Sequence, residues 1–195
     1  MKLSPRAVGL AAAVVTVTIW TSFIVIARAS ASHSLLPLDI AFLRTIGAGS
    51  VLLPWGWWLM RSQRQQGQAV GSLLGLSPLP LRITALAGVF GSLLYGMLAY
   101  SGFFFAPAAH ASVLMPGSLP LWTSLLAIVV LHEHITRARA MGLACIVLGD
   151  ILVGGASLLK AFDGGEVWRG DLLFMSAAFC WACYTVLVRR FSLDP

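Results

Sequence analysis

The stretch AAHASVLMPGSLPLWTSLLAIVVL-HEHITRAR-AMGLACIVLGDILVGG, residues 108–155, decides the fold. Its first part, through Leu131, contains no fully charged residue, and its last part contains a single one, Asp150. A short polar segment joins these two apolar parts. An α-helix rises about 1.5 Å per residue, so about 20 apolar residues cross the hydrocarbon core of a bilayer. We therefore predict two membrane-spanning helices connected by a tight turn.

The composition of the whole chain points the same way. Of its 195 residues, 58% are hydrophobic and only 10% are charged, whereas soluble domains have about 25% charged residues. The net charge is +6, but the basic residues are spread between apolar runs and form no patch of the kind that binds nucleic acid. We predict an all-α polytopic membrane protein whose partners are the lipid bilayer and a small-molecule solute, with no nucleic-acid partner.

Hydropathy predicts six transmembrane helices, at about residues 7–29, 37–60, 83–105, 108–131, 140–159 and 170–188. With this assignment, nine of the 13 Lys and Arg residues lie on the side that holds the N-terminus and three on the other side, while Arg44 lies inside a span. Basic residues are enriched in cytoplasmic connections. We therefore expect a multi-pass protein of the inner (plasma) membrane with a cytoplasmic N-terminus.

Two segments of the chain resemble each other. WTSFIVIAR, residues 20–28, and WACYTVLVR, residues 181–189, share Trp, an aromatic residue, Val, an aliphatic residue and Arg at identical spacing. Five predicted spans separate their starts, so the two copies cross the membrane in opposite directions, as in the inverted-topology repeats of secondary transporters. We predict a first five-helix repeat in residues 1–160. Residues 161–195 would hold a loop and the first helix of a second, truncated repeat.

Several short motifs match one known pattern. They are Trp20–Phe23, Pro37–Arg44, Leu131–Thr136 followed by Gly142 and Gly149, Gly170–Leu173, and Trp181–Arg190. In these motifs the chain resembles EamA-type carriers of the drug/metabolite transporter superfamily. The resemblance implies ten helices in two inverted five-helix repeats and transport of a small metabolite by alternating access, with export favoured. A missing second repeat, or another subunit, would complete the ten-helix unit. Thr21 and Asp150 depart from the pattern, which often has Gly and an aliphatic residue at these positions.

A solute cavity is expected near the membrane midplane, among the first four helices. Arg44 lies within an apolar span and cannot lose its proton. Its small neighbours one turn away, including Ala41 and Gly47, indicate that it faces other helices. It would contact an anion or form a gate with Asp150, unless it snorkels to the headgroups or belongs to a fixed structural pair. The candidate substrate contacts are Trp20, Arg44, Tyr95, Tyr100, Met115 and Ser118.

Asp150 is predicted to lie near the midplane, where ionisable groups usually face a cavity or a partner. We consider it a proton-coupling candidate, and the alternative is a neutral carboxyl group bonded to a neighbouring helix. In the preceding span, Pro116, Gly117 and Pro120 remove two helical hydrogen bonds and loosen the backbone. They predict a helix break beside a cavity, with a simple packing kink as the alternative.

The remaining polar residues favour structural roles. His110 is expected to be a hydrogen-bonded packing residue, and Glu133 to pair with Arg137 or Arg139 in the turn. His132 and His134 are two positions apart, whereas the helical zinc motif places its histidines four apart. We therefore expect no metal site and no cofactor. A transporter is favoured, and a non-transporting membrane assembly subunit or an intramembrane enzyme acting on lipid is the alternative. We predict no enzyme, because the sequence shows no convergent nucleophile or metal set.

Overall fold

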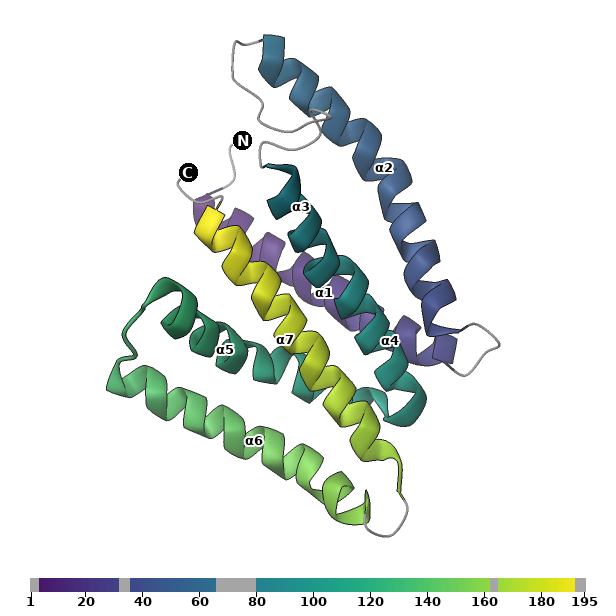
Figure 1. The fold of residues 1–195 in the computed structure, drawn as a ribbon, viewed down its shortest axis with the longest axis vertical. Helices are drawn as coiled ribbons and strands as arrows, with labels where there is room; N and C mark the ends of the chain where they lie inside the picture. The colour runs from purple at the N-terminus through teal and green to yellow at the C-terminus, as the bar shows by residue number, and fades with distance from the viewer. Residues whose placement is uncertain (1–3, 32–35, 66–79, 162–164, 192–195) are drawn as a thin grey trace.

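The structure is a computed structural model that describes residues 4–31, 36–65, 80–161 and 165–191. All regular elements in these ranges are helical. They are α1 (Pro5–Ala31), α2 (Pro37–Gln65), α3 (Leu81–Gly88), the π-helix η1 (Val89–Leu94), α4 (Tyr95–Phe105), α5 (Ala108–Leu131), α6 (Arg137–Ala161) and α7 (Val167–Phe191). The start of α1 and the end of α7 lie at the same end of the molecule in Figure 1. Part of the predicted connection at 61–82 lies outside the described residues.

Five helical segments of the described chain are long and apolar enough to cross a membrane. They are Arg6–Ser30, Leu81–Phe105, Ala108–Leu131, Arg137–Ala156 and Val167–Phe191. The second of them consists of α3, η1 and α4 in succession. The chain is therefore an all-helical, multi-pass membrane protein. Helix α2 has 29 residues but is not among these segments, because polar residues and a Trp- and Gly-rich run lower its hydropathy. The sixth span stays a prediction.

Prolines and short polar side chains mark where the helices begin. Pro5 and Pro37 are the first residues of α1 and α2, positions where the missing N–H costs no hydrogen bond. The Ser4 hydroxyl accepts a bond from the backbone N–H of Ala7 (3.2 Å), and Thr136 accepts one from Arg139 (3.3 Å) at the start of α6. These side chains satisfy donors that a helix start leaves free.

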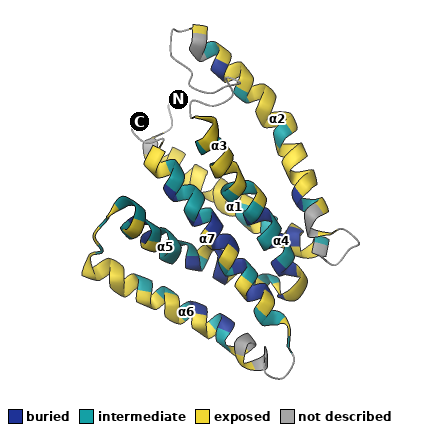
Figure 2. Cartoon of the chain, in the orientation of Figure 1, coloured by how far each residue is buried: buried dark blue, intermediate teal, exposed yellow. Residues whose placement is uncertain are grey.

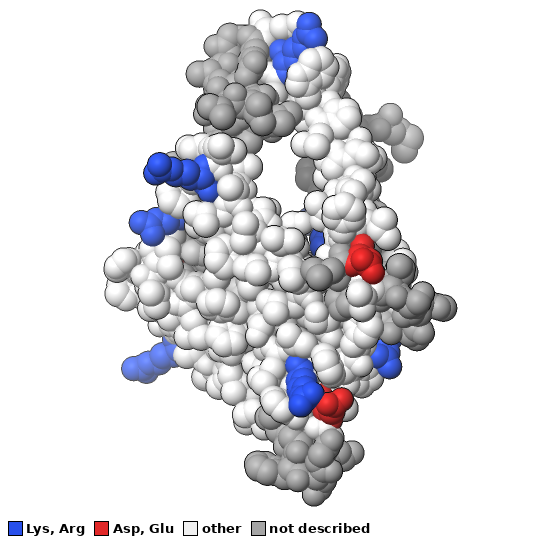
Figure 3. Space-filling model, turned by 45° about the vertical axis from the view of Figure 1, so that its right-hand side comes forward, with Lys and Arg blue, Asp and Glu red and all other residues white. Residues whose placement is uncertain are grey.

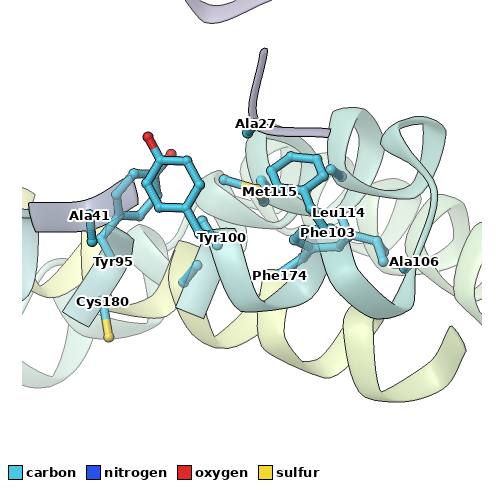
Figure 4. Packing of buried hydrophobic residues seen from close by; sticks show 13 residues of the cluster. Ala27, Ala41, Tyr95, Tyr100, Phe103, Ala106, Leu114, Met115, Phe174 and Cys180 are labelled. Atoms are coloured by element: carbon cyan, nitrogen blue, oxygen red, sulfur yellow. The ribbon is translucent and has the colours of Figure 1, made fainter. Parts of the chain in front are cut away.

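Helix α7 is the centre of the fold, because it packs against both α4 and α5. Figure 2 shows that buried residues concentrate on these three helices, whereas α1, α2 and α6 are mostly exposed. The ring centroids of Phe103 in α4 and Phe174 in α7 lie 5.0 Å apart, and both side chains are fully buried. Figure 4 shows them among the other apolar residues of this core. A membrane core of this kind is held by close packing.

Two glycines permit the close approach of α4 and α7. A Cβ atom on Gly102 would lie 2.6 Å from Cε1 of Phe174. A Cβ atom on Gly170 would lie 2.8 Å from the backbone nitrogen of Ala106 and 2.8 Å from the carbonyl oxygen of Gly102. The second clash is with backbone, which cannot rotate away. Only glycine fits where α7 begins against the end of α4.

Polar contacts join the helices at both ends of the molecule. At one end, the guanidinium of Arg28 in α1 donates to the carbonyl oxygen of Phe103, near the end of α4. At the other end, Glu133 pairs with Arg189 of α7 (2.5 Å) and with Arg139 (3.5 Å). The predicted pairing of Glu133 with an arginine of the turn is confirmed for Arg139. The bond to Arg189 was not predicted, because α7 is distant from the turn in sequence.

The predicted helix break is not found. Helix α5 runs without interruption through Pro116, Gly117 and Pro120, since a proline removes one hydrogen bond while packing on α7 supports both sides. The irregular segment lies instead in the preceding span, where η1 interrupts the α-helical pattern. Such π-helical turns often occur at functional sites. Its Gly91 lies against Tyr184, with Cγ of that ring 2.7 Å from where a Cβ would be.

Candidate functional site

Four helices enclose a cavity of about 300 Å³, here called the aromatic cavity. Its lining consists of Ile19, Trp20 and Phe23 of α1, Arg44 of α2, Tyr95 of α4 and Trp181 of α7. The structure therefore brings together three of the predicted substrate contacts, Trp20, Arg44 and Tyr95. Tyr95 directly follows the π-helical segment. Phe23 and Trp181 were not predicted as cavity residues, although both belong to the repeated motif that could have identified them.

The rings of this cavity hold one another in place. Trp20 and Trp181 are perpendicular, with centroids 5.8 Å apart. Tyr95 lies 5.0 Å from Trp181 and 6.3 Å from Phe23. These separations fall in the range of about 4.5–7 Å in which aromatic pairs attract each other. The cavity wall is thus a preformed aromatic surface, to which α1, α4 and α7 each contribute.

Arg44 supplies the positive charge of the aromatic cavity. Its Nη1 atom would lie 3.3 Å from a Cβ atom on Gly96, so the missing side chain of Gly96 lets the guanidinium approach α4. Arg44 is nevertheless exposed, and Figure 3 shows an opening between α2 and the rest of the molecule. In the part of the chain that the structure describes, no carboxylate pairs with Arg44. Its donors are therefore available to a ligand.

The other three predicted substrate contacts do not line the aromatic cavity. Tyr100, Met115 and Ser118 are buried in the core. Tyr100 packs against Phe23 with ring centroids 5.7 Å apart. The Ser118 hydroxyl donates to the carbonyl oxygen of Leu114 one turn earlier (2.5 Å). The sequence could not give the helix face on which these residues lie.

A second hollow, here called the carboxylate groove, lies between α5, α6 and α7. It measures about 260 Å³ and is lined by Leu114, Leu121, Val147, Asp150, Ile151, Gly154, Gly155, Trp168, Asp171, Leu172 and Met175. Asp150 lies here and Arg44 lies in the aromatic cavity. The two residues considered as gate partners thus line different hollows in this structure.

The two carboxyl groups of the groove differ in their surroundings. Oδ1 of Asp171 lies 2.7 Å from Nδ1 of His110, which confirms His110 as a hydrogen-bonded packing residue. Asp150 is only 8% exposed, and its Oδ2 atom is buried without a hydrogen-bond partner among the described residues. Its Oδ1 atom would lie 3.3 Å from a Cβ on Gly117 of α5. Among the described residues, Asp150 therefore has one acceptor that no donor satisfies.

Within the described ranges, no group of three or more His, Cys, Asp or Glu side chains is arranged to hold a metal ion. His132 adopts a left-handed conformation with φ of 56° and ends α5. His132 and His134 thus both lie in the connection between α5 and α6.

Comparison with known proteins gives the family. The sequence pattern of the EamA-like transporter family matches residues 7–155. The chain belongs to this family. It is 28% identical to the uncharacterized transporter YyaM of Bacillus subtilis over 57% of its own length and 35% of that protein. It is 27% identical to an uncharacterized transporter of Archaeoglobus fulgidus over 88% of its own length and 54% of that protein.

These matches define how much of a family member the chain represents. The chain spans about a third of one curated relative and about half of the other. No solved structure matches it. The match of the family pattern to residues 7–155 confirms the resemblance to EamA-type carriers that the sequence motifs show.

Proposed function

We propose that this chain forms part of a secondary transporter that moves a small organic anion with an aromatic or apolar body across the inner membrane by alternating access, in the direction of export. Membership of the EamA-like transporter family and the two transporter-named relatives support transport. The observation that carries the solute class is the aromatic cavity with Arg44 at its wall.

The chemistry of the aromatic cavity fits such a solute. A guanidinium that pairs with no carboxylate of the described residues offers paired N–H donors that match a carboxylate. The faces of Trp20, Tyr95 and Trp181 offer apolar area for the rest of the molecule. Ligand cavities commonly measure about 300–1,000 Å³, and the volume of about 300 Å³ here favours a small solute.

The repeat architecture is part of the same proposal. In it, residues 1–160 form the first five-helix repeat, residues 161–195 begin an inverted second repeat, and further helices of the same or another chain complete the unit. Trp20 and Trp181, which occupy equivalent positions in the two copies, touch each other, as residues near a twofold axis do. Their equivalent arginines bond at opposite ends of the molecule, Arg28 to Phe103 and Arg189 to Glu133.

The orientation follows from a sixth crossing by α2. Six crossings return the chain to its starting side, in keeping with the shared end of α1 and α7 in Figure 1. That end carries Glu133 with its two arginines, and the excess of basic residues there supports a cytoplasmic N-terminus. Lys2, which contributes to this excess, lies outside the described residues.

Asp150 is proposed as the proton-coupling residue. It is a buried carboxyl group in a membrane helix with one oxygen unbonded in the described chain, and such residues often form proton relays. Replacement by asparagine keeps the shape of the side chain and removes the exchangeable charge.

Uptake of radiolabelled 3-phenylpropionate into proteoliposomes containing the full natural protein tests the proposal. We expect saturable uptake that falls about tenfold or more in Arg44→Gln, because the loss of one charge-assisted contact exceeds about 1.4 kcal/mol. Arg44→Lys should retain part of the rate, and Arg61→Gln, which changes a cation stacked on Trp57 at the end of α2, should retain all of it. Asp150→Asn should abolish uptake driven by a pH gradient.

Two results would contradict the proposal. Equal uptake by the Arg44→Gln and wild-type proteins would show that Arg44 does not bind the solute. A wild-type protein that shows no saturable uptake of the probe would favour a non-transporting membrane subunit.

A further inference from the structure

The carboxylate groove is separate from the proposed solute cavity. Helix α7 lines both hollows, with Trp181 in the aromatic cavity and with Leu172 and Met175 in the groove. Successive residues of an α-helix are rotated by about 100°, so nine positions place Leu172 about 180° from Trp181. Apart from the proton-coupling role proposed for Asp150, the groove has no assigned ligand.

Asp150 has one carboxyl oxygen that lacks a hydrogen-bond donor among the described residues. The residue is 8% exposed, and its Oδ2 atom has no hydrogen-bond partner in the described chain. Leaving a buried acceptor unbonded is costly, and a buried carboxylate without a counter-charge is more so. Oδ1 lies toward Gly117 of α5, and the Asp150 side chain forms part of the groove wall, so a donor from outside would have to reach this carboxyl group through the groove.

The other described residues of the groove supply no donor or positive charge for Asp150. Asp171, the second carboxyl group, is held by His110 at 2.7 Å. Among the described residues, the lining contains no Lys or Arg, and most of its side chains are aliphatic, such as Leu121, Leu172 and Met175. A hard metal cation would need about six oxygen ligands, which this wall does not offer. An ammonium group needs an acceptor of opposite charge and an apolar surface for the carbon skeleton attached to it.

We propose that the carboxylate groove binds a small amphipathic ammonium ion, a monovalent organic cation with a short apolar body. Its N–H donates to the carboxyl group of Asp150, which rotates to meet it, and its body lies against Leu121, Leu172 and Met175. The volume of about 260 Å³ suits a body of about the size of a single aromatic ring with a short chain. The groove and the aromatic cavity then select opposite charges.

Binding of 2-phenylethylamine to the purified full-length natural protein in phosphatidylcholine nanodiscs, measured by isothermal titration calorimetry, tests this proposal. It requires no transport, so it can fail or succeed independently of the proposed function. We expect saturable binding of the amine, and binding of 2-phenylethanol, which has a similar shape and no charge, about tenfold weaker or worse. Asp150→Asn should weaken binding of the amine by a similar factor.

The control variant is Glu166→Gln. It removes the same charge from a carboxylate that pairs with Arg169 near the start of α7 and does not line the groove, so binding of the amine should be unchanged. Should Asp150→Asn fail to fold, Leu172→Trp fills the groove without altering the carboxylate and should abolish binding.

Four results would overturn the proposal. They are no saturable binding of the amine, equal affinity for the amine and the alcohol, and equal affinity of the wild-type protein and a folded Asp150→Asn or Leu172→Trp variant. The fourth is loss of amine binding when phosphatidylethanolamine is added to the nanodiscs, which would assign the groove to a lipid headgroup.

Discussion

The aromatic cavity and the carboxylate groove lie on different faces of α7 and are built in opposite ways. The aromatic cavity has ring walls and a guanidinium that stays exposed and permanently charged. The groove has aliphatic walls and a buried carboxyl group, one oxygen of which has no partner among the described residues. Arg44 and Asp150 line different hollows, so neither group neutralises the other.

Both hollows depend on the same central helix, so the largest effect should come from disturbing its packing. Gly170→Ala places a methyl group against the backbone of Ala106 and Gly102. Overpacking costs about 1–3 kcal/mol, and a clash with backbone belongs at the upper end of this range. We expect a large loss of thermal stability and of binding to both hollows, measured by size-exclusion chromatography after heating and by calorimetry.

Gly142→Ala is the matched control for this experiment. A Cβ atom on Gly142 meets nothing within 4 Å, and alanine is the better helix former. Its thermal stability should equal or exceed that of the wild-type protein. If the two variants were equally stable, the close packing of α7 against α4 would not determine the stability of the fold.

A pair of smaller changes should separate the two hollows. A Cβ on Gly96 would lie 3.3 Å from Nη1 of Arg44, and a Cβ on Gly117 would lie 3.3 Å from Oδ1 of Asp150. We expect Gly96→Ala to weaken 3-phenylpropionate roughly fivefold and Gly117→Ala to weaken 2-phenylethylamine by a similar factor, about 1 kcal/mol each. Calorimetry on both variants with both ligands measures this. If either variant lowered the affinity for both ligands, the two hollows would not be separate.

The smallest effect should come from the ion pairs at the turn. Glu133 bonds Arg189 and Arg139, none of which lines either hollow, with the acid 28% exposed and the arginines more so. Exposed pairs contribute about 0–1 kcal/mol and are screened by salt. Glu133→Gln should lower stability slightly at low salt and leave both affinities unchanged. A change in either affinity would show that the turn is coupled to the ligand hollows.

Sequence alone predicted the helices and part of the site. Apolar runs and basic connections set the spans, and five of them are confirmed as membrane-capable helices within the described residues. Trp20, Arg44 and Tyr95, three of the predicted substrate contacts, line the aromatic cavity together. Tyr100, Met115 and Ser118 are buried in the core instead, since hydropathy does not give the face of the helix on which a residue lies.

Features that depend on long-range contact were beyond the sequence. The pairing of His110 with Asp171 joins α5 to α7, and no local pattern specifies it. The π-helical segment has no proline to mark it, whereas the prolines of α5 marked a helix that continues. Asp150 was recognised as unusual, but its separation from Arg44 could be seen only once the helices were packed.

Competition between the two ligands distinguishes two separate hollows with opposite charge preference from a single shared site. The affinity of the full natural protein for 3-phenylpropionate is measured by calorimetry, first alone and then with 2-phenylethylamine at saturation. If the two hollows are separate, the affinity for 3-phenylpropionate is unchanged, because the ligands occupy different faces of α7. Mutual displacement of the two ligands would contradict this prediction and show that the protein has a single shared site.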